Sequence, residues 1–118
     1  MNPVLITGAA GFIGMHCAKR LLAQGVPVVG IDNLNNYYDV ALKQARLNEL
    51  RPFANFRFVE LDVADRDGMA RLFAEVAPAK VLHLAAQAGV RYSIDQPDDY
   101  TDSNLLGFGN ILQGCRKH

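Results

Sequence analysis

The chain has 118 residues, of which 50% are hydrophobic and 20% charged, a size and balance typical of one packed domain. Its 12 Lys and Arg residues equal its 12 Asp and Glu residues in number, so no basic excess favours a nucleic acid or an anionic membrane as a partner. No apolar run reaches the roughly 18 residues of a membrane span, and the N-terminus shows no signal region, so we expect a cytoplasmic location.

The first elements of the chain predict a strand, a glycine-rich turn and a helix. The apolar strand Val4–Thr7 leads into Gly8-Ala9-Ala10-Gly11-Phe12-Ile13-Gly14, and the pattern predicts a helix over Phe12–Gln24 that Gly25 ends. Glycine lets a backbone turn sharply and approach a ligand closely, and a helix start offers unpaired N–H groups. The expected ligand is the pyrophosphate of a dinucleotide, and the alternative is a turn that only packs a helix on a strand.

A second apolar strand is predicted from about residue 26 to 31, and Asp32 follows it. A carboxylate at this place can accept hydrogen bonds from the ribose of an adenosine. It would also repel a 2′-phosphate, so the sequence favours NAD over NADP. The alternative is a solvated residue at the end of a strand.

The middle of the chain continues the alternation of helix and strand. Asp39 is expected to cap a helix over Val40–Leu50, and Asp65 a helix whose apolar residues recur at helical spacing. The strand Phe56–Leu61 carries charges, which indicates a sheet edge. A fourth strand, Lys80–Leu84, comes next.

The end of the chain predicts a long helix that reaches Arg116, with Asp98 or Asp99 as its cap. An apolar stripe follows it through Leu105, Phe108, Leu112 and Cys115. Strands that alternate with helices are parallel and joined by right-handed crossovers. We therefore predict an α/β, Rossmann-like sheet with helices on both faces, strand order 3-2-1-4, and a ligand at the carboxyl ends of the first two strands.

The cysteines and histidines predict no metal or redox site. Cys17 and Cys115 are far apart in the sequence, and we expect both to be buried free thiols. Cys17 lies on the apolar stripe of the first helix with Ile13 and Leu21. His83 lies in an apolar run, which favours a core or crevice histidine over a ligand.

Five motifs together resemble the extended short-chain dehydrogenase/reductase family, in particular its NAD-dependent nucleotide-sugar epimerases and dehydratases. They are Thr7-Gly8-Ala9-Ala10-Gly11-Phe12-Ile13-Gly14, Asp32-Asn33-Leu34-Asn35, Leu61-Asp62-Val63, His83-Leu84-Ala85-Ala86-Gln87 and Tyr100-Thr101-Asp102-Ser103-Asn104. Within the family, the segments 32–39 and 86–93 look most like the UDP-glucuronate 4-epimerases.

The resemblance implies a set of NAD-binding residues. They are Gly8, Gly11, Phe12, Ile13 and Gly14 at the pyrophosphate, Asp32, Asn33, Leu34 and Asn35 at the ribose, Asp62 and Val63 at the adenine, Leu84, Ala85, Ala86 and Gln87 toward the nicotinamide, and Asn104 nearby. Arg91 is the candidate for the substrate's carboxylate or phosphate. Simpler interpretations remain: Asp62 in a turn, Asn104 facing water, Arg91 in a solvated loop, and Lys43 and Arg46 on a solvated helix face.

The family's Tyr-x-x-x-Lys pair is missing, because none of the four tyrosines is followed by lysine at that spacing. The resemblance implies that this pair, a fifth strand and a UDP-sugar domain follow in the parent enzyme, which would oxidise C4 of the sugar, rotate the keto sugar and reduce it again. We expect the chain alone to be inactive and to self-associate through its last helix or its fourth strand. Other epimerases, a 4,6-dehydratase and a non-catalytic NAD-binding module remain alternatives.

Overall fold

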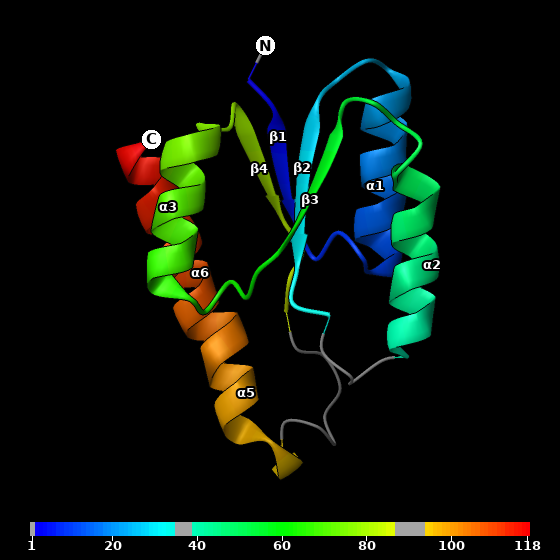
Figure 1. Cartoon of the computed structure of the whole chain (residues 1–118). Helices are drawn as coiled ribbons and strands as arrows, with labels where there is room; N and C mark the ends of the chain where they lie inside the picture. Colours follow the sequence, from blue (N-terminus) through cyan, green and yellow to red (C-terminus); the bar gives the residue numbers. More distant parts are fainter. Residues whose placement is uncertain (1, 35–38, 87–93) are drawn as a thin grey trace.

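The computed structural model describes residues 2–34, 39–86 and 94–118 (Figure 1). Within them, a parallel sheet is formed by β1 (Val4–Thr7), β2 (Val28–Asp32), β3 (Phe56–Glu60) and β4 (Lys80–His83). The strand order is β3-β2-β1-β4, which confirms the prediction. β3 lies at one edge, as its charged residues indicate, and β4 lies at the other.

Helices cover both faces of the sheet (Figure 1). One face carries α1 (Phe12–Ala23) and α2 (Val40–Leu50), and the other carries α3 (Arg66–Val76) and α6 (Gly107–Lys117). The two cores follow from the alternation of side chains along a strand. Ile6 belongs to the core that includes Leu47 of α2, whereas its neighbour Leu5 packs with Phe73 of α3.

The predicted helix ends are confirmed at three places. The Asp39 carboxylate accepts a hydrogen bond from the N–H of Ala41, and the Asp65 carboxylate accepts one from Gly68. Gly25 has a φ of 81°, the left-handed conformation that glycine adopts readily after a helix. These local signals position β2, α2 and α3, and therefore the loops at the carboxyl ends of the strands.

The expected burial on α1 and at the cysteines was partly wrong. α1 buries Gly14, Met15, Ala18 and Leu22, whereas Ile13 is exposed. Cys17 is half-buried and packs against the core on this face of the sheet, as Leu21 does, whereas Cys115 is exposed. The reason is that Gly14 lies against the backbone of Gly8 and Ala9, so this side of α1 faces the protein and the neighbouring Ile13 is left exposed.

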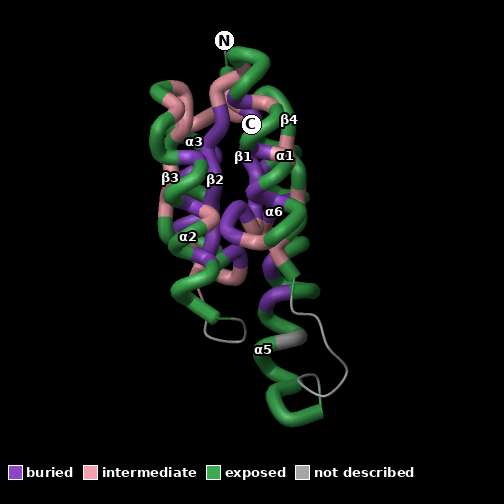
Figure 2. The backbone as a smooth tube through the Cα atoms, turned by 90° about the vertical axis from the view of Figure 1, so that its right-hand side faces the viewer, coloured by how far each residue is buried: buried purple, intermediate pink, exposed green. Residues whose placement is uncertain are grey.

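The last helix begins earlier than predicted and has a π-helical middle. α5 (Pro97–Thr101) continues through η1 (Asp102–Leu106) into α6. Gln96 is the cap, because Pro97 takes the first turn, where its missing N–H costs nothing. Asp98 and Asp99 therefore lie inside the first turn. Figure 2 shows that α5 extends beyond the body of the sheet as an exposed segment.

α6 faces the protein with its small residues and not with its long apolar stripe. Gly107, Ile111 and Gly114 are buried, and a Cβ atom at Gly114 would meet the ring of Phe73. Leu105, Leu106, Phe108 and Leu112 are exposed. Ile111 belongs to the core that includes Phe73 of α3.

No helix in the described part of the chain is both long enough and apolar enough to cross a membrane.

Candidate dinucleotide-binding site

A pocket of about 450 Å³ opens where the carboxyl ends of the strands meet. Most of the residues that sequence analysis assigned to NAD line it: Gly8, Gly11, Phe12, Ile13, Gly14, Asp32, Asn33, Asp62, Val63, Leu84, Ala85 and Ala86. Ile31, Leu42, Lys43, Arg46, Leu61 and Ser103 complete the lining. The topology thus brings six separate segments of the sequence to one place.

The glycine turn lies against its neighbours with no room for side chains. Gly8 has a φ of 71°, and a Cβ atom there would lie 3.0 Å from the Ala85 nitrogen. A Cβ atom on Gly14 would fall on the carbonyl oxygen of Gly8. The turn therefore needs glycine at both positions for close approach of backbone to backbone.

The start of α1 is open toward the pocket. Gly11 is the N-cap, no side chain forms a capping hydrogen bond there, and the first turn has no acidic residue. Gly11, Phe12 and Ile13 line the pocket. The first N–H groups of a helix have no partner within the helix, and its dipole attracts negative charge. This arrangement suits a phosphate or pyrophosphate group.

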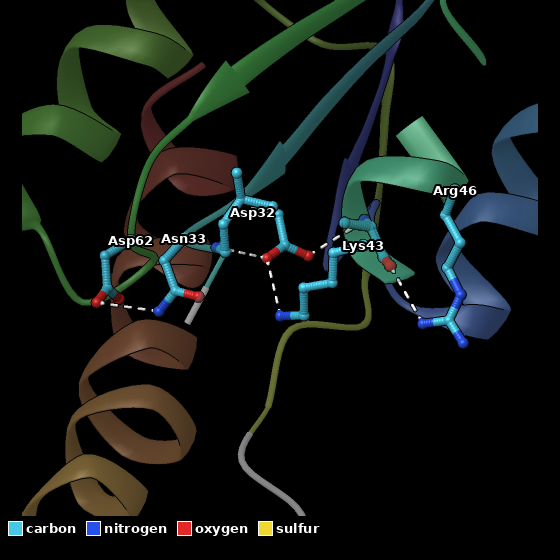
Figure 3. A network of polar contacts seen from close by, with 7 residues as sticks. Asp32, Asn33, Lys43, Arg46 and Asp62 are labelled. Carbon is cyan, nitrogen blue, oxygen red and sulfur yellow. Dashed lines mark hydrogen bonds and ion pairs between the residues drawn. The ribbon is translucent and has the colours of Figure 1, made fainter. Parts of the chain in front are cut away.

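Asp32 is buried at the end of β2 and its carboxylate holds three donors (Figure 3). Oδ2 accepts from the N–H of Ala10 at 3.1 Å, which ties β2 to the glycine turn. Oδ1 accepts from the N–H of Leu34 at 2.8 Å and from Nζ of Lys43 at 3.2 Å. Leu34 has a φ of 55°, so the carboxylate stabilises a left-handed backbone that leucine rarely adopts.

The placement of Lys43 and Arg46 on a solvated helix face was wrong. Lys43 is 7% exposed and forms an ion pair with Asp32. Nη1 of Arg46 donates to the carbonyl oxygen of Ala10 at 3.3 Å, and its guanidinium lies 5.9 Å from the centre of the Phe12 ring. A signal was present, because Lys43 precedes the buried Leu47 and Leu50 at helical spacing and so shares their face.

The loop after β3 forms another wall of the pocket. Asp62 accepts from the Ala64 N–H at 2.9 Å and from Nδ2 of Asn33 at 3.4 Å. The carbonyl oxygen of Val63 accepts from Nδ2 of Asn110 at 2.8 Å, so α6 holds this loop. Asp62 therefore has the turn role considered above, while one side of it still faces the pocket.

A hydrogen-bonded cluster joins the end of β4 to the end of β1. Oγ1 of Thr7 accepts from the N–H groups of Leu84 at 2.9 Å and Ala85 at 3.0 Å. Nδ1 of His83 lies 2.8 Å from the same oxygen. With both acceptor sites of the hydroxyl in use, Thr7 donates its proton to Nδ1, which assigns the His83 proton to Nε2. His83 also stacks on Phe108 of α6. It is thus a satisfied crevice histidine.

Some predicted residues lie outside this pocket lining. Leu34 donates its N–H to Asp32 but does not line the pocket, and Asn104 is exposed on η1. Its neighbour Ser103, which sequence analysis missed, is buried and lines the pocket. Asn35, Gln87 and Arg91 lie outside the described residues. Among the described residues, no cluster of His, Cys, Asp and Glu has the arrangement of a metal site.

The His83 cluster predicts a pH-dependent stability. Burial lowers the pKa of His83 below its ordinary value of 6.5. The unfolded chain then binds a proton more readily than the folded chain, so the free energy of unfolding should fall as the pH drops below about 6.5. In His83→Asn, the amide oxygen can replace Nδ1 as the acceptor for Thr7 without titrating.

Urea unfolding at several pH values between 5 and 8 tests this prediction. The wild-type chain should lose stability relative to His83→Asn as the pH falls, with His16→Asn, an exposed position, as the matched control. A constant difference between wild type and His83→Asn over that range would contradict the prediction.

Comparisons with known proteins agree with this geometry. UDP-glucuronate 4-epimerase 1 of Arabidopsis thaliana is 49% identical over 113 residues, which are 96% of this chain and 26% of that protein. The crystal structure of UDP-glucuronic acid 4-epimerase from Bacillus cereus in complex with UDP-glucuronic acid and NAD has 33% identity and a TM-score of 0.85, over 96% of this chain and 36% of that one. UDP-glucose 4-epimerase from Thermotoga maritima with UDP-glucose has 34% identity and a TM-score of 0.82, over 98% of this chain and 34% of that one.

The chain spans about a third of the length of the curated relatives it matches. A family model described as GDP-mannose 4,6 dehydratase matches residues 5–118, which is nearly all of the sequence. The chain therefore belongs to this family, within the extended short-chain dehydrogenases/reductases that its motifs resemble.

Proposed function

We propose that residues 1–118 form the NAD-binding domain of a nucleotide-sugar epimerase. The main support is that the open start of α1 and the buried Asp32 line one pocket at the carboxyl ends of β1 and β2. This is where parallel α/β sheets bind dinucleotides. The solved epimerases from Bacillus cereus and from Thermus thermophilus, which are similar in fold to this chain, are described as complexes with NAD.

The residues present fit this cofactor. Gly8 and Gly14 pack directly against backbone atoms, which holds the turn tightly at the start of α1. The main-chain N–H groups at this helix start can then bind the pyrophosphate. Asp32 would accept from the ribose, Asp62 and Val63 would meet the adenine, and Leu84, Ala85 and Ala86 would line the path toward the nicotinamide. When bound, NAD would supply the hydride acceptor and, once reduced, the hydride donor.

The proposed reaction is epimerisation at C4 of UDP-glucuronate. The support is the similarity to UDP-glucuronate 4-epimerases of Arabidopsis thaliana and Thermodesulfobacterium geofontis. UDP-glucose 4-epimerases are nearly as similar in structure, so they and the 4,6-dehydratases are the competing assignments. Arg91 remains the candidate for binding the substrate. No residue of the chain is proposed as the proton-transfer group, and we expect the 118 residues alone to show no turnover.

Nucleotide titration tests the cofactor assignment. By calorimetry, the full-length gene product should bind NAD more tightly than NADP, because the Asp32 carboxylate repels a 2′-phosphate. Gly14→Ala should weaken NAD binding by about tenfold or more, equivalent to about 1.4 kcal/mol, because its Cβ atom displaces the turn.

Gly109→Ala is the matched control, since a Cβ atom at Gly109 meets nothing within 4 Å. It should bind NAD as the wild type does. Tighter binding of NADP than of NAD, or equal effects of the two substitutions, would contradict the assignment.

A panel of UDP-sugars tests the proposed reaction. Incubated with NAD, the full-length gene product should interconvert UDP-glucuronate and UDP-galacturonate, followed by chromatography. It should convert UDP-glucose and UDP-galactose at least about tenfold more slowly. The reverse preference would favour the UDP-glucose 4-epimerase assignment, and formation of a stable 4-keto sugar would favour a dehydratase.

We also propose that the 118-residue chain associates with itself. Leu105 and Leu112 of the last helical segment are 67% and 54% exposed, and Leu82 on the edge strand β4 is 38% exposed. Exposed apolar stripes and unpaired strand edges both favour association. Light scattering should show a dimer or a larger species for the wild-type chain. If the last helix mediates the contact, the double variant Leu105→Glu with Leu112→Glu should shift the population toward monomer. A monodisperse wild-type monomer at high concentration would contradict this proposal.

A further inference from the structure

The ion pair between Asp32 and Lys43 has a further consequence for cofactor specificity. Both side chains are almost fully buried, with exposed fractions of 6% and 9%, and their charged atoms lie 3.2 Å apart. Two buried charges of opposite sign stabilise each other, and removing one leaves the other without compensation. The buried ammonium group of Lys43 therefore requires a neighbouring negative charge, and Asp32 supplies it.

A second cation lies close by on the same helix. Arg46 follows Lys43 by one turn of α2, and both line the pocket (Figure 3). Arg46 donates to the carbonyl oxygen of Ala10, while the N–H of Ala10 donates to Asp32. Asp32 and Arg46 thus hold the same residue of the glycine turn from its two sides.

The charge balance of this corner depends on Asp32. Lys43 and Arg46 contribute two positive charges there, and Asp62 is the other carboxylate among the described lining residues. Asp62 belongs to the opposite loop and already accepts from Ala64 and Asn33. Without the charge of Asp32, the α2 side of the pocket would be strongly positive at the place where the ribose is expected.

We propose that Lys43 and Arg46 form a latent site for the 2′-phosphate of NADP, which Asp32 keeps closed. This inference rests on the proposed function. In the wild type, Lys43 neutralises Asp32 and so allows a carboxylate to be buried beside a ribose. The same lysine, freed from Asp32, offers a charge-assisted donor to a phosphate, and Arg46 offers a second one. Lys43 is then a specificity-determining residue.

The test compares NAD and NADP binding to the full-length gene product by calorimetry. In Asp32→Asn, which keeps the shape of the side chain but loses its charge, the ratio of NADP to NAD affinity should rise by about 10- to 100-fold. This is the size expected from one new charge-assisted hydrogen bond or more. Because a charged contact is screened by salt, the NADP affinity of the variant should fall more steeply with salt than the NAD affinity of the wild type.

Two double variants separate the role of Lys43 from a general change in charge. Asp32→Asn with Lys43→Met should lose the gain in NADP affinity, because the proposed phosphate donor is gone. Asp32→Asn with Lys19→Met should keep it, since Lys19 pairs with Glu49 on the exposed surface and not in the pocket. The two double variants carry the same net charge.

Asp32→Asn leaves Lys43 buried and unpaired, so this variant is expected to be less stable than the wild type. A second measurement therefore compares two ligands on the same variant. In thermal melting, 2′,5′-ADP should raise the melting temperature of Asp32→Asn and of Asp32→Ser more than 5′-AMP does. In the wild type, 2′,5′-ADP should raise the melting temperature no more than 5′-AMP does.

The outcomes distinguish the two levels of the proposal. If the wild type binds NAD but Asp32→Asn gains no NADP affinity, or if the Lys43→Met and Lys19→Met double variants behave alike, the latent site is wrong and the NAD assignment stands. If the wild type binds neither nucleotide, the proposed function and this inference both fail.

Discussion

The site depends on the close packing of the glycine turn between β1, β4 and the start of α1. Gly8 lies against the backbone of Leu84 and Ala85, and Gly14 lies against the carbonyl of Gly8. With no side chains between these backbone segments, the start of α1 is held at the pocket. The rest of the pocket is built around this turn, because β4 and β2 both bond to it or to the strand that precedes it.

Two side chains, Asp32 at the end of β2 and Thr7 at the end of β1, fix the turn relative to both neighbouring strands. On one side Asp32 accepts from Ala10, and on the other Thr7 accepts from Leu84 and Ala85. α6 joins this arrangement at a distance, since Phe108 stacks on His83 and Asn110 holds Val63. The helix that carries the exposed apolar stripe therefore also supports two walls of the pocket. Changes on its inner face should reach the site without touching a ligand.

Much of the fold could be predicted from the sequence because its signals are local. The alternation of apolar strands and amphipathic helices gives the parallel sheet and its order, and the caps at Asp39 and Asp65 place two helices. The glycine spacing and Asp32 give the pocket. These features depend on neighbours in the sequence or on topology rules that hold for parallel sheets in general.

The remaining features depend on contacts between distant residues. Helical spacing places Lys43 on the buried face of α2, but the carboxylate that pairs with it comes from β2. On α6, Gly107 and Gly114 face the protein together with Ile111, because Gly114 makes room for the Phe73 ring. Ser103 reaches the pocket within a π-helical turn, which shifts the helical register and which residue spacing alone does not predict.

The central claim is that a dinucleotide's pyrophosphate binds the main-chain N–H groups at the start of α1. Amide chemical shifts, measured by NMR during addition of NAD, test this most directly. The largest changes should fall on the N–H groups of Gly11, Phe12, Ile13 and Gly14, with a second group at Asp32 and its neighbours. Changes confined to another surface, with the amides of the glycine turn unaffected at saturating NAD, would contradict it.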